Sequence, residues 1–160
     1  MKKILSKPWV KNVLMVLAVP IFGFILLNVT FIVDALFQRG LDMLVRPFVQ
    51  TGFNMAWRWS PPVKHVLFMI LVGIASWFIL RSKLRTIFKA IYSVVPMAVV
   101  LVTLGIAFYR WPIVPFLLGG LFSGGCLFYC YRTKQPWPYY YAIILVSLTL
   151  GIFTLAGGEI

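Results

Sequence analysis

Residues 90–109 read AIYSVVPMAVVLVTLGIAFY, a run of twenty residues without a charged side chain. A helix needs about 20 mostly apolar residues to cross the hydrocarbon core of a bilayer. In hydrocarbon, every backbone N–H and C=O must be paired within its own segment or with neighbouring strands of a closed barrel. Barrel strands alternate polar and apolar residues, and this run does not alternate. The stretch therefore predicts a membrane-spanning α-helix.

Four more apolar runs of similar length flank this one, and each is bounded by charged, proline or aromatic residues. They lie at about 12–37, 63–80, 113–131 and 138–157. No repeat or hydrophilic segment long enough for a separate domain interrupts them. We expect an all-α, polytopic transmembrane helix bundle of about five spans, with residues 1–160 forming one integral membrane domain.

The composition excludes an ordinary soluble domain. The chain is 62% hydrophobic and only 11% charged, whereas soluble domains carry about 25% charged residues. Its net charge of +12 comes from 15 Lys and Arg against 3 Asp and Glu. In a soluble protein that excess would suggest nucleic acid. Here the basic residues lie between apolar runs, so we expect membrane lipids and no nucleic acid as partners.

The basic residues also predict an orientation, because Lys and Arg are enriched in cytoplasmic connections. With five spans, one side of the membrane carries ten of them and the other carries five. The ten are Lys2, Lys3, Lys7, Lys11, Arg81, Lys83, Arg85, Lys89, Arg132 and Lys134. This count places the N-terminus in the cytoplasm and the C-terminus outside. The lysine-rich start fits a multi-pass protein of a bacterial plasma (inner) membrane.

The stretch between the first two spans has the pattern of an amphipathic helix. Apolar residues recur at helical spacing from Leu41 to Ala56, and polar residues form another stripe at intervals of four. The polar stripe consists of Asp42, Arg46, Gln50, Asn54 and Arg58. We predict an interfacial helix at about 41–58, broken or begun near Pro47. It would lie along the outer membrane surface or dip into it as a re-entrant segment.

Five basic residues on the expected outer side form a candidate anion site. They are Arg39, Arg46, Arg58, Lys64 and Arg110. Guanidinium groups pair well with phosphate oxygens, so a lipid phosphate, a lipid diphosphate or an anionic solute could bind here. Ordinary contact with lipid headgroups is the alternative explanation.

Asp34 and Asn28 are the polar residues of the first predicted span that we single out as candidates. Asp34 is the only acid within a span, and intramembrane carboxylates often mark functional sites. It could pair with Arg39, Lys64 or Arg110 at the interface, handle a proton or cation, or contact a partner subunit. Asn28 lies deeper, where an interhelical hydrogen bond is the simplest expectation.

The fourth span is rich in small residues, which let helix backbones approach closely in a membrane. These residues are Gly119, Gly120, Ser123, Gly124 and Gly125, and they include one GxxxG match. We expect this helix to be tightly packed, within the chain, against a membrane-protein partner or in a homo-oligomer.

Catalytic and metal-binding patterns are not recognisable. With three acids and one histidine, the chain offers no catalytic residues to name, and we expect no metal or cofactor. A membrane enzyme is disfavoured, and two other hypotheses about function remain. The first is a non-enzymatic subunit or accessory component of a membrane complex. The second is a small transporter or lipid-handling protein that binds an anionic group at the outer basic residues, with Asp34 as a coupling or gating residue.

Overall fold

The computed structural model describes residues 8–49, 60–108, 110–111 and 113–156, and these residues form five helices. The helices are α2 (Pro8–Val49), α4 (Ser60–Arg81), α5 (Thr86–Ala107), α6 (Ile113–Arg132) and α7 (Trp137–Leu155). All five are long and apolar enough to cross a membrane. The predicted all-α transmembrane bundle is therefore confirmed, and the chain is a multi-pass integral membrane protein.

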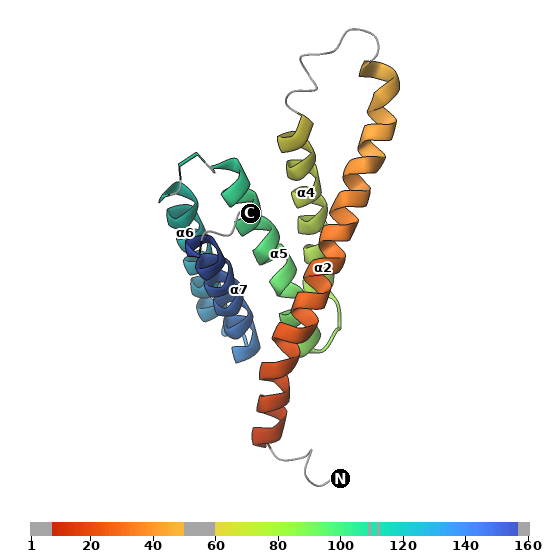
Figure 1. The fold of residues 1–160 in the computed structure, drawn as a ribbon. Helices are drawn as coiled ribbons and strands as arrows, with labels where there is room; N and C mark the ends of the chain where they lie inside the picture. The colour runs from red at the N-terminus through yellow and green to blue at the C-terminus, as the bar shows by residue number, and fades with distance from the viewer. Residues whose placement is uncertain (1–7, 50–59, 109, 112, 157–160) are drawn as a thin grey trace.

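Consecutive helices run in opposite directions and are joined by short connections where the chain is described (Figure 1). The lower end of the bundle in Figure 1 holds the start of α2 and the α4–α5 and α6–α7 connections. The upper end holds the end of α2, the start of α4 and the α5–α6 connection. Basic residues predicted to share one side of the membrane, including Arg81, Lys83 and Arg132, thus share the lower end.

α2 is the one helix that differs clearly from expectation. It continues as α-helix from the first span through Val49. Residues 41–49 of the predicted interfacial helix are therefore the last turns of α2 and do not begin a separate helix, and the chain stays helical through position 47. The rest of that prediction, residues 50–58, lies outside the described residues. At about 1.5 Å per residue, the 42 residues of α2 extend over roughly 63 Å, twice the ~30 Å of a hydrocarbon core.

α5 is the centre of the bundle and contacts each of the other four helices. One apolar cluster joins α5 to α2, α6 and α7, and includes Val19, Val94, Ala98 and Ala142. A second cluster joins α5 to α4 through Val95, Val99, Phe68 and Val72, and Leu26 and Phe37 of α2 pack against it. Neighbouring positions of α5 thus belong to different clusters, and the helix has seven buried residues.

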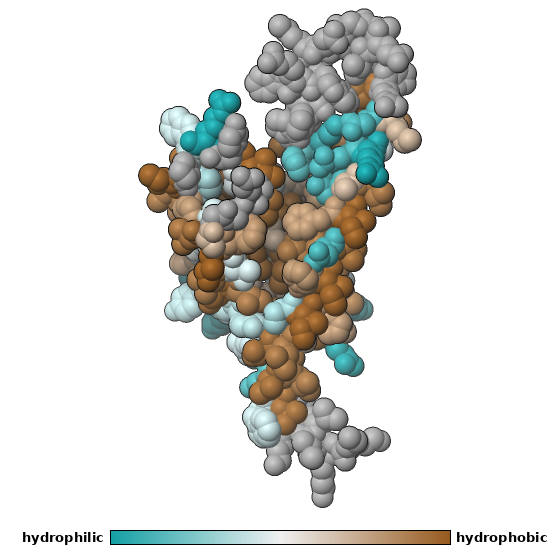
Figure 2. Space-filling view, viewed as in Figure 1, coloured by the Kyte–Doolittle hydropathy of each residue, from teal (hydrophilic) through white to brown (hydrophobic). Residues whose placement is uncertain are grey.

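The other helices present most of their apolar side chains to the outside. In the most apolar window of α5, 44% of the residues are buried, against 11% in the windows of α2 and of α6. Figure 2 shows hydrophobic residues over the middle of the molecule and hydrophilic ones mainly toward its ends. A surface of this kind is stable only when lipid surrounds it.

Candidate functional site

Polar side chains link α2 to α4 near the upper end of the bundle. Gln38 Nε2 donates a hydrogen bond of 2.9 Å to Asp34 Oδ2, and His65 Nδ1 lies 3.9 Å from the same oxygen. One turn beyond Gln38, Asp42 forms an ion pair with Lys64. The spacing of four on α2 and the adjacent positions on α4 place these groups on facing sides of the two helices. We call these five residues the α2–α4 polar cluster.

Asp34 is the member whose bonding is incomplete. Its side chain is 14% exposed, and its Oδ1 is buried without a hydrogen-bond partner among the described residues. A buried carboxylate oxygen without a donor is costly, and a proton, water or cation on that oxygen would relieve the cost. The described neighbours of Asp34 Oδ2 are thus Gln38 and His65. The roles considered for Asp34, including pairing with Arg39, Lys64 or Arg110, stay predictions.

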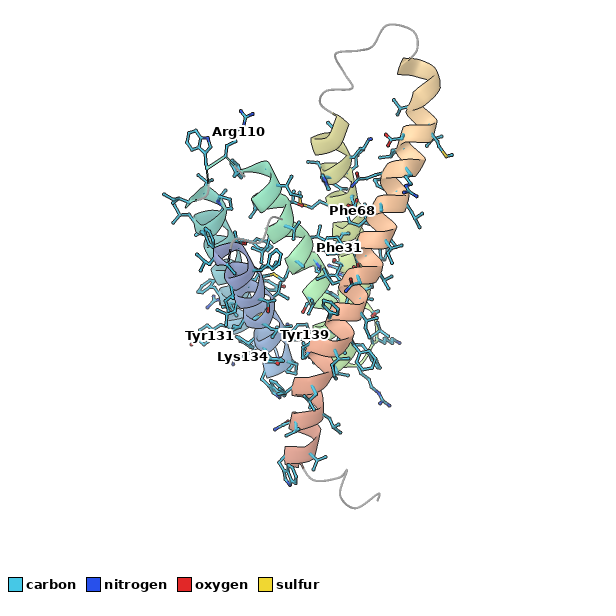
Figure 3. All side chains as sticks on the ribbon, viewed as in Figure 1. Phe31, Phe68, Arg110, Tyr131, Lys134 and Tyr139 are labelled. Atoms are coloured by element: carbon cyan, nitrogen blue, oxygen red, sulfur yellow. The ribbon has the colours of Figure 1, made fainter. Side chains whose placement is uncertain are left out.

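The structure does not gather the five basic residues of the candidate anion site into one described pocket. Lys64 is paired with Asp42, and Arg39 is exposed on α2. Figure 3 shows Arg110 at the α5–α6 connection, directed away from the bundle. The side chains of Arg46 and Arg58 lie outside the described residues. Binding of an anion by this group stays a prediction.

Asn28 differs from its expected role. Its Nδ2 donates to the carbonyl of Phe24, four residues earlier in the same helix, at 2.7 Å. Thr30 Oγ1 likewise donates to the carbonyl of Leu26, at 2.8 Å. The expected interhelical bond of Asn28 is thus replaced by a bond within α2, and its side chain is exposed.

One face of α6 is packed inside the chain, and it holds two of the small residues singled out from the sequence. A Cβ added to Gly119 would lie 3.1 Å from Leu101 Cδ2 on α5. The hydroxyls of Ser123 and Ser147 on α7 are 2.8 Å apart. Gly119 and Ser123 are both buried, so their small size is explained by contacts within this chain.

The opposite face of α6 holds the other three small residues and is open. A Cβ added to Gly120, Gly124 or Gly125 would meet no heavy atom within 4 Å. Large apolar residues frame these glycines, with Leu117 67% exposed and Leu121 75% exposed. Phe128 continues the stripe and is 68% exposed. We call the surface of Leu117, Gly120, Leu121, Gly124, Gly125 and Phe128 the outward glycine face.

The structure also shows contacts that the sequence pattern did not reveal. Gly23 of α2 lies against α5, where an added Cβ would be 3.0 Å from Val94 Cγ2. The Asp42–Lys64 pair joins residues 22 positions apart. Both contacts depend on which faces of two apolar helices meet. A single sequence does not reveal which faces these are.

Comparisons with models of protein families, with curated proteins and with solved structures find no match to this chain.

Proposed function

We propose that this protein is a non-enzymatic integral subunit or accessory component of a membrane complex, and that it associates through the outward glycine face. The observation that carries the proposal is the division of small residues on α6. Gly119 and Ser123 pack inside the chain, whereas a Cβ added to Gly120, Gly124 or Gly125 would meet no heavy atom of the described residues within 4 Å.

The physical argument is that lipid tails are as apolar as the side chains they touch, so apolarity alone does not bring membrane helices together. Close backbone approach and van der Waals packing do so, and small residues permit both. The outward glycines recur at helical spacing on the side of α6 that faces away from α5 and α7. Leu117 and Leu121 provide ridges beside them, so a second helix could pack its own side chains between these ridges.

The test compares association of the wild-type chain with that of Gly120→Leu/Gly124→Leu after extraction in mild detergent. Leucine favours helix and adds bulk, so the variant should fold while its partner helix is held away. The mass of the wild-type particle should exceed that of one 18.3 kDa chain. The double variant should lose at least tenfold in its association constant. This corresponds to a loss of about 1.4 kcal/mol or more in the free energy of association.

Gly73→Leu is the matched control. Gly73 lies on α4, is exposed, and has no heavy atom within 4 Å of an added Cβ. This control should leave the mass of the particle unchanged. A wild-type particle that is strictly monomeric and free of partners would contradict the proposal, and so would equal effects of the two variants.

The second candidate is proton- or cation-coupled transport, which Asp34 Oδ1 favours because it is buried without a hydrogen-bond partner among the described residues. Under this hypothesis, proteoliposomes of the full chain carry protons under an imposed voltage, and Asp34→Asn abolishes the flux. Flux through Asp34→Asn equal to that of the wild type would exclude this role for Asp34.

We further infer that the N-terminus lies in the cytoplasm of a bacterial plasma membrane, which the ten-to-five distribution of basic residues supports. Single cysteines at Lys134 and at Arg110, in a chain with Cys126 and Cys130 replaced by alanine, report the two ends of the bundle. In intact cells, a membrane-impermeant thiol reagent should label the cysteine at position 110 and not the one at 134. The reverse pattern would invert the orientation.

A further inference from the structure

The connection between α4 and α5 concentrates positive charge at the lower end of the bundle. Four basic residues fall between the last residue of α4 and the first turn of α5: Arg81, Lys83, Arg85 and Lys89. The two acids among the described residues, Asp34 and Asp42, lie on the part of α2 that packs against the start of α4. Their carboxylates are therefore near the upper end and do not neutralise the charge of this connection.

Two of the four basic residues are held in place by contacts within the chain. The guanidinium carbon of Arg81 lies 3.8 Å from the ring centroid of Trp77. Lys89 Nζ donates to the carbonyl of Leu80 at 2.6 Å, and Ser82 Oγ donates to that of Ile79 at 2.6 Å. These bonds occupy carbonyls in the last turn of α4, which have no partner inside the helix. Both ends of the connection are therefore bonded to the last turn of α4.

The position of Arg81 indicates what its charge faces. Trp77 lies on a membrane-spanning helix and is 58% exposed, so its ring faces lipid. A guanidinium group that stacks on an aromatic ring contacts the ring through the flat face of the guanidinium. The N–H groups at the edge of the guanidinium stay available to phosphate oxygens. Arg81 thus presents its donors on the exposed side of α4, at the last residue of this span.

Apolar side chains alternate with the charges along the connection. Leu84 is 50% exposed between Lys83 and Arg85, and Phe88 is 55% exposed beside Lys89. A dissolved anion would pair with the basic groups and leave these apolar side chains in water. A phospholipid satisfies both kinds of group, because its phosphate and its acyl chains lie next to each other.

We propose that the α4–α5 connection is a binding site for the headgroup phosphate of anionic phospholipids. Arg81, Lys83 and Arg85 supply the donors to phosphate, and Leu84 and Phe88 pack against the upper acyl chain. The α6–α7 connection at the same end has only two basic residues, Arg132 and Lys134, and serves as an internal reference. Figure 3 places Lys134 beside α6 and α7, on the side of the bundle away from α2.

The test uses the full chain reconstituted in vesicles of equal parts phosphatidylglycerol and phosphatidylcholine. After gentle extraction, native mass spectrometry gives the ratio of the two lipids retained on the protein. The wild type should retain phosphatidylglycerol preferentially. Lys83→Gln/Arg85→Gln should lower that preference on the order of tenfold, since each basic group near an anionic surface contributes a factor of several.

The matched control is Arg132→Gln/Lys134→Gln, which removes the same charge at the same end of the bundle. It should lower the preference by no more than about twofold, because Arg132 and Lys134 lie outside the proposed site and act on its lipid only through a field that salt screens. Equal losses in the two variants would overturn the proposal, because they would assign the effect to the overall charge of that end. Circular dichroism should show unchanged helix content in both variants.

A second arm separates lipid from a dissolved anion as the source of the phosphate. Excess inorganic phosphate should release no more phosphatidylglycerol from the wild type than chloride does at the same ionic strength. Specific release by inorganic phosphate would show that the connection prefers a soluble anion and would overturn the assignment to lipid. A wild type without any preference between the two lipids would do the same.

Discussion

The two faces of α6 carry the same kind of residue and have opposite surroundings. On the inward face, Gly119 lies against Leu101 and Ser123 lies against Ser147. On the outward face, Gly120 and Gly124 have no neighbour within 4 Å of an added Cβ. Small residues next to each other in sequence can therefore differ completely in what they contact. A GxxxG match by itself does not tell which side of a helix is already used.

The inward face should be the more sensitive to added volume, and Gly119→Leu tests it with the largest expected effect. Even the first added carbon would lie 3.1 Å from Leu101 Cδ2, and the full side chain must displace neighbours. Overpacking of this kind costs about 1–3 kcal/mol, so we expect a loss near the upper end of that range. The free energy of unfolding in detergent is the measurement.

Gly120→Leu is the neighbouring control for that prediction. It adds the same side chain to open space and removes a glycine from a helix, which stabilises by roughly 0.5–1 kcal/mol. The isolated chain should therefore be unchanged or slightly more stable. Equal destabilisation by the two leucines would show that the faces do not differ as described.

Gly23→Ala extends the comparison to the contact between α2 and α5. The added methyl would lie 3.0 Å from Val94 Cγ2, and Val94 is buried. Valine has one favoured rotamer in a helix, so it cannot easily turn away. We expect a net loss of about 1 kcal/mol in the free energy of unfolding, after the gain from replacing glycine. Gly73→Ala, in open space, should be stabilising, and a loss there would contradict this reasoning.

Ser123→Ala should have the smallest effect on the inward face. It removes the contact with the hydroxyl of Ser147 but leaves no clash. Hydrogen bonds between membrane helices contribute about 0.6 kcal/mol on average, so a loss near that value is expected in thermal or denaturant unfolding. A loss above about 2 kcal/mol would mean that this bond matters more than such bonds usually do.

The spans could be predicted from the sequence because the bilayer imposes a simple requirement. A helix that crosses it needs a long apolar run, and runs such as 113–131 matched α6 (Ile113–Arg132) closely. The continuation of α2 through Val49 was not predicted. The polar residues of that stretch suggested a new element, but amphipathic character is compatible with the same helix continuing beyond the membrane.

The packing of the bundle could not be predicted, because the faces of α2, α4, α6 and α7 differ little in apolarity. The faces of α5 differ more, but this asymmetry alone does not tell which helices pack against it. The same ambiguity applies to the candidate sites. The sequence suggested Lys64 and Arg110 as parts of one group, whereas the structure pairs Lys64 with Asp42. It also suggested five small residues on α6 without indicating that they divide between two faces.

The most direct test of the account is crosslinking in the native membrane from two matched phenylalanines. Phe128 lies on the outward glycine face and Phe24 on α2, and both are 68% exposed. Each is replaced in turn by a photoreactive phenylalanine analogue. If α6 associates through the outward glycine face, position 128 gives a protein adduct that disappears in Gly120→Leu/Gly124→Leu, and position 24 gives only lipid adducts. Lipid adducts alone from both positions would contradict this association.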